Sequence, residues 1–173
     1  RDLPRDEVYS EIFAYPSELM DAMSARPPDV LMLSNYVWNE SLSRFFLRRA
    51  KELNPNALTV MGGPNIPVEP ERQIEFLANW PEIDLYVLGE GDFLASDIVE
   101  ALLEANGSLE RLGEQEIASS VHRKPDGRIV RTEQHSRVKG RDINDIPSPW
   151  LTGVMDRFFD GKLAPIIETN RGC

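Results

Sequence analysis

Short apolar runs alternate with amphipathic segments over the first two thirds of the chain. Runs of four or five largely apolar residues suit strands that are buried on both faces, and they occupy residues 30–33, 57–61 and 85–88. Apolar side chains recur at helical spacing in the segments around them, over residues 18–25, 40–53, 71–80 and 92–106. This alternation predicts an α/β fold with a doubly wound, right-handed parallel sheet.

The pattern changes after Gly107. Two alternating runs, residues 118–123 and 128–131, flank the sequence Pro125-Asp126-Gly127. A Pro-Asp-Gly turn between alternating runs predicts a β-hairpin, which we expect to form a small appendage to the sheet. The stretch around Pro147 and Pro149 is expected to be an extended connector, because a residue before proline avoids the helical region.

Composition narrows the class of protein without identifying it. The chain has 173 residues, of which 41% are hydrophobic and 28% charged, so it can form a core and remain in solution. The formal net charge of −10 disfavours nucleic acid as a partner. No stretch approaches the roughly 18 apolar residues that would span a bilayer, so no membrane partner is expected. The single cysteine excludes an internal disulfide and fits a reducing, cytoplasmic setting.

The candidate binding site lies where the three predicted strands end. In open α/β sheets, ligands bind beyond the carboxyl ends of the strands, so the residues that follow each apolar run should line one rim. They are Ser34, Asn35, Tyr36 and Val37 after the first run, Gly62, Gly63 and Pro64 after the second, and Gly89, Glu90 and Gly91 after the third.

The first two of these segments have a ligand-binding and a purely structural interpretation, and both stay open. Gly62 and Gly63 would allow a bulky ligand to approach the backbone, or would form a tight turn. Ser34 and Asn35 would hold a polar ligand, or would bond to the local backbone. Tyr36, like Trp38 nearby, would stack on a flat ligand or belong to the core.

The third segment and the histidines are equally open to interpretation. Glu90 would bond a ligand, or would accept backbone N–H groups near the start of the next helix. His122 and His135 have no partner at metal-ligand spacing, and we expect both to lie on the surface. No G-x-G-x-x-G, Walker loop or Ser/His/Asp order occurs, which weighs against nicotinamide and nucleoside triphosphate ligands.

Five motifs occur in order along the chain, roughly from Pro28 to Cys173: "PDVLMLSNYVWN", "VMGGPN", "DLYVLGEGD", "IPSPWLTG" and "IIETNRGC". Each motif alone is weakly specific. Taken together and in this order, they resemble the amino-terminal half of cobalamin-binding radical S-adenosylmethionine enzymes.

The resemblance implies a Rossmann-like, flavodoxin-like domain that binds cobalamin, followed by a partial TIM-type barrel. It divides the chain into a cobalamin-binding domain over 1–110, a β-hairpin appendage and Pro-rich connector over 111–150, and the start of the barrel over 151–173. It also implies that cobalamin contacts the three rim segments defined above, residues 34–37, 62–64 and 89–91.

In this family a C-x-x-x-C-x-x-C motif holds a [4Fe–4S] cluster that binds S-adenosylmethionine. Cys173 matches the first cysteine of that motif, and the other two would lie beyond it. Because one thiolate cannot hold a cluster, we expect this fragment to be inactive by itself. The full-length enzyme would need an electron donor for the cluster and would act on a small organic substrate, with methyl transfer the commonest expectation.

One departure from the family and two other functions remain open. Many cobalamin domains carry D-x-H-x-x-G, but neither His122 nor His135 follows an aspartate at that spacing, so the lower axial ligand of cobalt is undefined. Either the loop with that motif lies upstream of Arg1, or the lower face of cobalamin is held without histidine, as the resemblance implies for many radical members. A first strand of the sheet would also lie upstream of Arg1. The alternatives are a non-catalytic, flavodoxin-like sensory module and a nucleotide-binding α/β domain.

Overall fold

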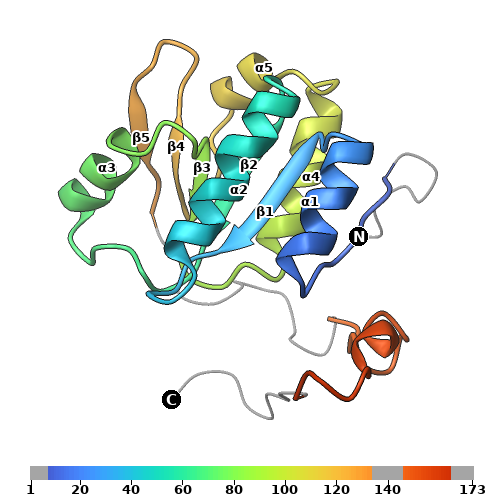
Figure 1. Ribbon diagram of the computed structural model, residues 1–173. Coiled ribbons are helices and arrows are strands. Elements are labelled where there is room, and N and C mark those ends of the chain that lie inside the picture. Colours follow the sequence, from blue (N-terminus) through green and yellow to red (C-terminus); the bar gives the residue numbers. More distant parts are fainter. Residues whose placement is uncertain (1–7, 134–145, 165–173) are drawn as a thin grey trace. The chain divides into compact units, whose positions relative to one another are not determined.

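The structure is a computed structural model that describes residues 8–133 and 146–164 (Figure 1). The chain forms two compact units, Arg1–Lys139 and Gly140–Cys173, which are described separately. The first unit contains the sheet and every element discussed for the candidate site. The described residues contain no helix that is both long and apolar enough to cross a lipid bilayer.

One five-stranded sheet forms the centre of the first unit, with the strands in sequential order β1-β2-β3-β4-β5. The strands are β1 (Val30–Ser34), β2 (Leu58–Gly62), β3 (Leu85–Val87), β4 (Ser120–Arg123) and β5 (Ile129–Arg131). The pairs β1–β2 and β2–β3 are parallel, whereas β3–β4 and β4–β5 are antiparallel. The α/β class is therefore confirmed, with a sheet that is parallel in its first three strands and mixed as a whole.

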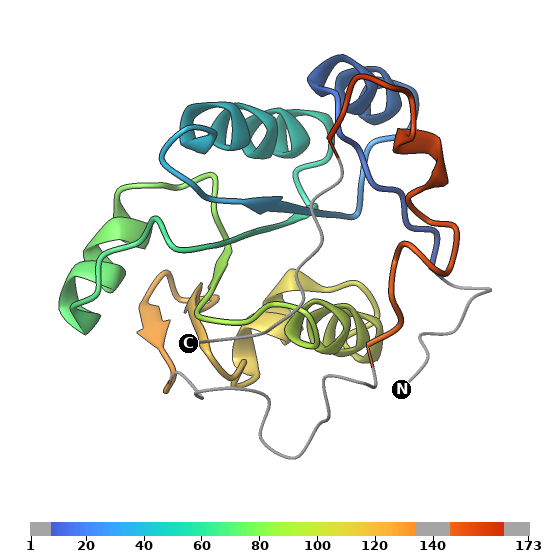
Figure 2. The same cartoon turned by 90° about the horizontal axis from the view of Figure 1, so that it is seen from below.

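Helices cover both faces of this sheet (Figure 2). They are α1 (Pro16–Ala25), α2 (Glu40–Leu53), α3 (Pro70–Ala78), α4 (Leu94–Glu104) and α5 (Leu109–Glu114). Buried side chains of α1, α2 and α3 share a core with Met61 and Tyr86, whereas those of α4 and α5 share the other core with Val60 and Leu85. Successive residues of β2 and of β3 thus enter opposite cores, as the pleat of a strand requires.

The predicted hairpin differs from the expectation in where it lies. β4 pairs with β3, with Leu85 opposite His122 and Val87 opposite Ser120, so the hairpin extends the main sheet instead of standing apart from it. Arg123 strengthens this junction, because its guanidinium donates hydrogen bonds to the carbonyls of Leu77, Trp80 and Ile83, at and beyond the end of α3. A single core can therefore use residues from both sides of Gly107.

Helix boundaries follow the sequence pattern closely, with one element missed. The predicted helix over 40–53 is α2 with the same limits. Asn39 is the N-cap residue of α2, but its side chain makes no cap hydrogen bond to the helix. α5 was not predicted, because six residues are too few to show helical periodicity.

In the second unit, the described residues 146–164 contain one short 3₁₀ helix, η2 (Asp156–Phe158). It lies within residues 151–173, which the family resemblance assigns to the start of the barrel. The rings of Trp150 and Phe159 lie beside each other there, with centroids 5.5 Å apart. Cys173, its motif and His135 lie outside the described residues.

Candidate functional site

The carboxyl ends of the three parallel strands are aligned in one row. Ser34 pairs with Gly62, and Gly62 pairs with Val87, across the register of β1, β2 and β3. The segments that follow these residues consequently leave the sheet from one edge, the lower edge in Figure 1, which we call the carboxyl edge. The sequence predicted that the three rim segments begin side by side at the ends of the strands, and the strand register confirms this for the residues at which they begin.

Asn39 holds the β1–α2 segment in shape. Its Oδ1 accepts a hydrogen bond from the Tyr36 backbone N–H at 2.7 Å, and its Nδ2 donates to the Ser34 hydroxyl at 2.8 Å. From α2, the Ser43 hydroxyl donates to the Ser34 carbonyl at 2.8 Å. Because these bonds tie both ends of the segment to fixed elements, residues 35–38 form a defined turn at the carboxyl edge.

This turn presents an apolar surface to solvent. Tyr36 and Trp38 are stacked, with ring centroids 4.7 Å apart and planes inclined by 12°. Val37 and Trp38 are each 81% exposed, and Tyr36 is 36% exposed. We call Tyr36, Val37 and Trp38 the aromatic platform. Because Tyr36 and Trp38 are exposed, the interpretation of these rings as core residues is wrong. Exposed clusters of large apolar side chains commonly mark a surface that binds a partner or ligand.

Asn35 lies below the platform and is completely buried. Its Nδ2 donates to the Asn65 carbonyl at 2.7 Å and to the Tyr86 hydroxyl at 3.1 Å, while its Oδ1 accepts from Asn65 Nδ2 at 3.2 Å. The Tyr86 hydroxyl donates in turn to the Gly63 carbonyl at 2.9 Å. The Asn35 amide therefore joins the first two rim segments to each other.

Burial dominates the electrostatics of this network. It raises the pKa of Tyr86 to about 12; the hydrogen bond from Asn35 lowers that pKa, and the charge of Glu40 raises it. The phenol is therefore neutral near neutral pH and remains a hydrogen-bond donor to Gly63. Glu40 also accepts a hydrogen bond from Asn65 Nδ2 at 2.6 Å, which connects the network to the start of α2.

Gly63 needs its lack of a side chain for internal packing. Its φ is +127°, and a Cβ atom there would lie 2.5 Å from the Asn35 carbonyl oxygen and 3.1 Å from its nitrogen. The open space that the sequence suggested for a ligand is thus occupied at Gly63 by the Asn35 backbone. The tight-turn interpretation accounts for this residue, whereas Pro64, which is exposed, stays a predicted contact.

The third rim segment is less constrained by neighbours. Gly89 is exposed with a φ of +79°, and Glu90 is half-buried. A Cβ at Gly91 would meet only a Val87 methyl group, at 3.8 Å. Contacts of Gly89, Glu90 and Gly91 with a ligand stay predictions, as do those of Ser34 and Gly62.

Sequence reasoning missed the residues that support this edge. Asn65 was noted only as a residue that follows the second apolar run, and Tyr86 was not singled out, although a tyrosine inside a buried apolar run is a sign that its hydroxyl has a partner. Within the described ranges, no three His, Cys, Asp or Glu side chains are close enough to hold a metal ion. The predicted cluster ligand, Cys173, lies outside those ranges.

The prediction that His122 lies on the surface is wrong. His122 is 2% exposed, because its strand joins the main sheet opposite Leu85 and is covered there. His122 lies in β4 beside the amino-terminal end of β3, and therefore away from the carboxyl edge.

Comparison with known proteins indicates the family to which the chain is related. No protein-family model matches the chain. It is 31% identical, over 160 residues and 84% of its length, to the cobalamin-dependent radical SAM methyltransferase TokK of Streptomyces tokunonensis. The chain is related to the cobalamin-binding radical S-adenosylmethionine family.

Two further relatives of the chain are also methyltransferases by name. One is the 2-(S-pantetheinyl)-carbapenam-3-carboxylate methyltransferase of Streptantibioticus cattleyicolor, which is 34% identical over 155 residues and 84% of this chain. The other is the uncharacterized methyltransferase PH0819 of Pyrococcus horikoshii, which is 30% identical over 125 residues and 72% of this chain. The matches cover 21% of each of the first two relatives and 25% of the third, so the chain spans about a quarter of their length or less. The family resemblance found in the five motifs is thereby confirmed, and a methyltransferase-related function is supported.

Proposed function

We propose that this chain is the cobalamin-binding part of a radical S-adenosylmethionine methyltransferase. The observation that carries the proposal is the alignment of Ser34, Gly62 and Val87 in one row beside an exposed aromatic platform. Two relatives at 31–34% identity, one of them named as cobalamin-dependent, support the choice of ligand.

The residues at the carboxyl edge fit a large, flat and partly apolar cofactor. Tyr36, Val37 and Trp38 offer an apolar surface that is free of other contacts on its solvent side, as an 81% exposure of Trp38 requires. The exposed Ser34 and the half-buried Glu90 offer polar atoms beside it for the amide side chains that surround a corrin ring. Asn35, Tyr86 and Gly63 hold these residues in place through their hydrogen bonds.

Bound cobalamin would supply a cobalt-carried methyl group to the full-length enzyme. The role of this chain would be to bind the cofactor and to keep one of its faces against protein. Cys173 would provide the first thiolate of a [4Fe–4S] cluster with S-adenosylmethionine, and the acceptor would be a small organic substrate. Those parts of the proposal concern the full-length protein, in which further cysteines and an electron donor are required.

Binding of hydroxocobalamin to the purified chain tests the proposal. The corrin absorption band is measured after desalting, and the dissociation constant is measured by titration calorimetry. We expect the band to stay with the protein at a ratio near one to one. A chain that loses all corrin on desalting and gives no binding heat would contradict the proposal.

Two valines provide a matched pair of variants for this measurement. Val37 is 81% exposed in the platform, and Val68 is 87% exposed outside the three rim segments. Val37→Ser should weaken cobalamin binding about tenfold, because it removes an apolar contact surface. Val68→Ser should bind as the parent does, since it changes the same chemistry elsewhere. Equal affinities for the two variants would exclude the platform as the contact surface.

A further inference from the structure

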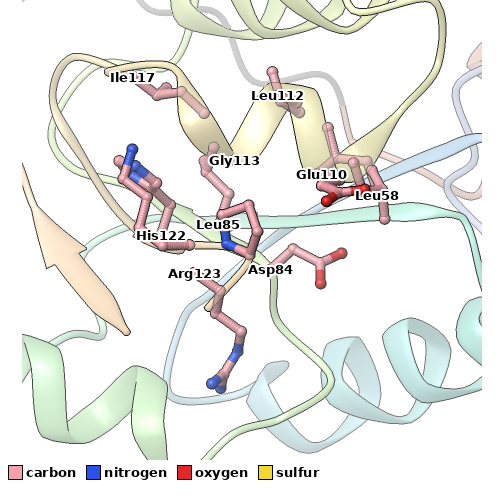
Figure 3. Close-up of a pocket in the computed structure, with 12 residues that line it drawn as sticks. Leu58, Asp84, Leu85, Glu110, Leu112, Gly113, Ile117, His122 and Arg123 are labelled. Carbon is pink, nitrogen blue, oxygen red and sulfur yellow. The ribbon is translucent and has the colours of Figure 1, made fainter. Parts of the chain in front are cut away.

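A cavity lies at the opposite end of the sheet from the carboxyl edge. It has a volume of about 330 Å³ and is lined at its base by Leu58 and Leu85, the first residues of β2 and β3. Leu112 and Gly113 of α5 lie on its other side (Figure 3). Along β2, Leu58 in this cavity and Gly62 at the carboxyl edge are about 13 Å apart, at roughly 3.3 Å per residue. We call this cavity the α5 pocket.

One residue that lines the α5 pocket has a buried polar atom without a partner among the described residues. His122 lines the pocket and is 2% exposed, and its Nε2 has no hydrogen-bond partner in the described part of the chain. Such an atom is uncommon, because a buried polar group that forms no hydrogen bond costs about 1–3 kcal/mol. It therefore requires an explanation.

The neighbours of His122 fix which of its ring nitrogens has the proton. The Ser120 hydroxyl donates to the Ile117 carbonyl at 2.7 Å, so its one proton is already used. The same oxygen lies 2.9 Å from His122 Nδ1, so with its own proton on the Ile117 carbonyl it accepts from Nδ1–H, and the ring proton is then on Nδ1. Nε2 consequently has a free lone pair and can only accept. Burial, aided by the charge of Lys124, lowers the pKa of His122 to about 4, so the ring is neutral near pH 7.

The rest of the lining consists of an apolar wall and four charged side chains, two acidic and two basic. Leu58, Leu85, Leu109, Leu112 and Ile117 form most of the wall. The lining acids Asp84 and Glu110 offset the lining bases Arg123 and Lys124 in number.

Three of these four charged groups already have partners. Asp84 pairs with Lys51 at 2.6 Å, and Lys124 donates to the Gln115 carbonyl at 2.8 Å. Arg123 bonds the carbonyls at and beyond the end of α3, and Figure 3 shows it extending away from the labelled leucines. Glu110, the fourth, is exposed to solvent, so within the apolar wall His122 Nε2 is the acceptor that the pocket offers an uncharged ligand.

We propose that the α5 pocket is a binding site for a small, uncharged, largely apolar molecule with one N–H or O–H group, which donates to His122 Nε2. The volume is at the lower end of the roughly 300–1,000 Å³ typical of ligand pockets, so the ligand is small. This site is separate from the proposed cobalamin surface, and either can exist without the other.

Indole is the probe that tests this proposal, because it is an apolar bicyclic molecule with a single N–H donor. Its titration into the 173-residue chain is followed by NMR, through the methyl groups of Leu58, Leu85, Leu112 and Ile117 and through the ring nitrogens of His122. We expect saturable methyl shifts together with a shift of the unprotonated Nε2 resonance. The matched probe, 1-methylindole, keeps the apolar body and lacks the donor. It should bind about fivefold more weakly, as the loss of one hydrogen bond predicts.

A variant locates the difference on one atom. His122→Phe keeps an aromatic ring without the acceptor, so it should bind indole and 1-methylindole equally well. If that variant does not fold, the Nε2 resonance of the parent protein decides the question alone. Methyl groups that do not respond to indole, equal affinity of the parent for both probes, or an Nε2 resonance that does not move would each overturn the proposal.

Discussion

The two ends of the sheet differ in which groups are exposed and which polar atoms are paired. At the carboxyl edge, buried polar groups are fully paired with one another while apolar side chains stand in solvent: Asn35 is 0% exposed and Trp38 is 81% exposed. At the α5 pocket, the apolar side chains are buried and one polar atom, His122 Nε2, is unpaired. At the carboxyl edge the hydrogen bonds are satisfied and the apolar surface is exposed. At the α5 pocket the apolar surface is buried and one hydrogen-bond acceptor is unsatisfied. The binding proposed at the two ends therefore rests on two different physical signals.

The largest effect should come from Gly63, which holds the framework of the carboxyl edge together. In Gly63→Ala the new Cβ would lie 2.5 Å from the Asn35 carbonyl oxygen, at a φ that L residues rarely adopt. We expect the free energy of unfolding in urea to fall by about 3 kcal/mol. Gly91→Ala is the matched control, since its Cβ would meet only a methyl group at 3.8 Å, and it should change little. Equal stability of the two variants would show that the close approach is not rigid.

A smaller effect should follow from removing one hydroxyl group below the platform. Tyr86→Phe keeps the buried ring but leaves the Gly63 carbonyl and one Asn35 N–H without their partner. The free energy of unfolding should fall by about 1–2 kcal/mol. The edge-to-face contact of residue 86 with Phe76 should survive, so near-ultraviolet circular dichroism should stay close to that of the parent. A variant as stable as the parent would mean that the network does not hold the two rim segments together.

An effect of similar size concerns the pH dependence of stability at the α5 pocket. The pKa of His122 is about 4 in the folded protein and near 6.5 when the chain is unfolded. The unfolded state therefore binds a proton first as the pH falls, and the folded state loses stability between pH 6.5 and about 4, with no contribution above that range. From about pH 7 to about pH 5 this loss should amount to about 1–2 kcal/mol.

The His122→Gln variant isolates that loss from the titration of the carboxylates. It should show a shallower decline in the free energy of unfolding over the same pH interval, because glutamine does not titrate. Parallel declines for parent and variant would show that the imidazole is accessible to protons in the folded state.

The fold was predictable in those elements that have a strong period. Residues 40–53 show an apolar stripe over nearly four turns, and α2 has those limits. The partner of β4 was not predictable, because alternation identifies a strand without identifying its neighbour in the sheet. The error about His122 follows from this, since a histidine in an isolated hairpin is exposed and one that is paired with Leu85 is buried.

The candidate site divides in the same way. The rule for strand ends placed Ser34 and Gly62 together, and the structure pairs them. That rule could not separate residues that face solvent, such as Val37, from residues that build the edge, such as Asn35 and Gly63. The distinction depends on which backbone atoms approach each other across 30 residues of sequence, and no local pattern encodes it.

The antiparallel pairing of β4 with β3 bears on where this protein can be shortened. A version that ended near residue 110, where the motifs alone place a domain boundary, would strip β3 of one neighbour and leave its backbone N–H and C=O groups open along Leu85–Val87. Open strand edges of this kind attract other chains, so such a truncation should aggregate. A minimal soluble unit has to retain β5 as its outermost strand, and crystallisation or labelling designs should begin from that limit.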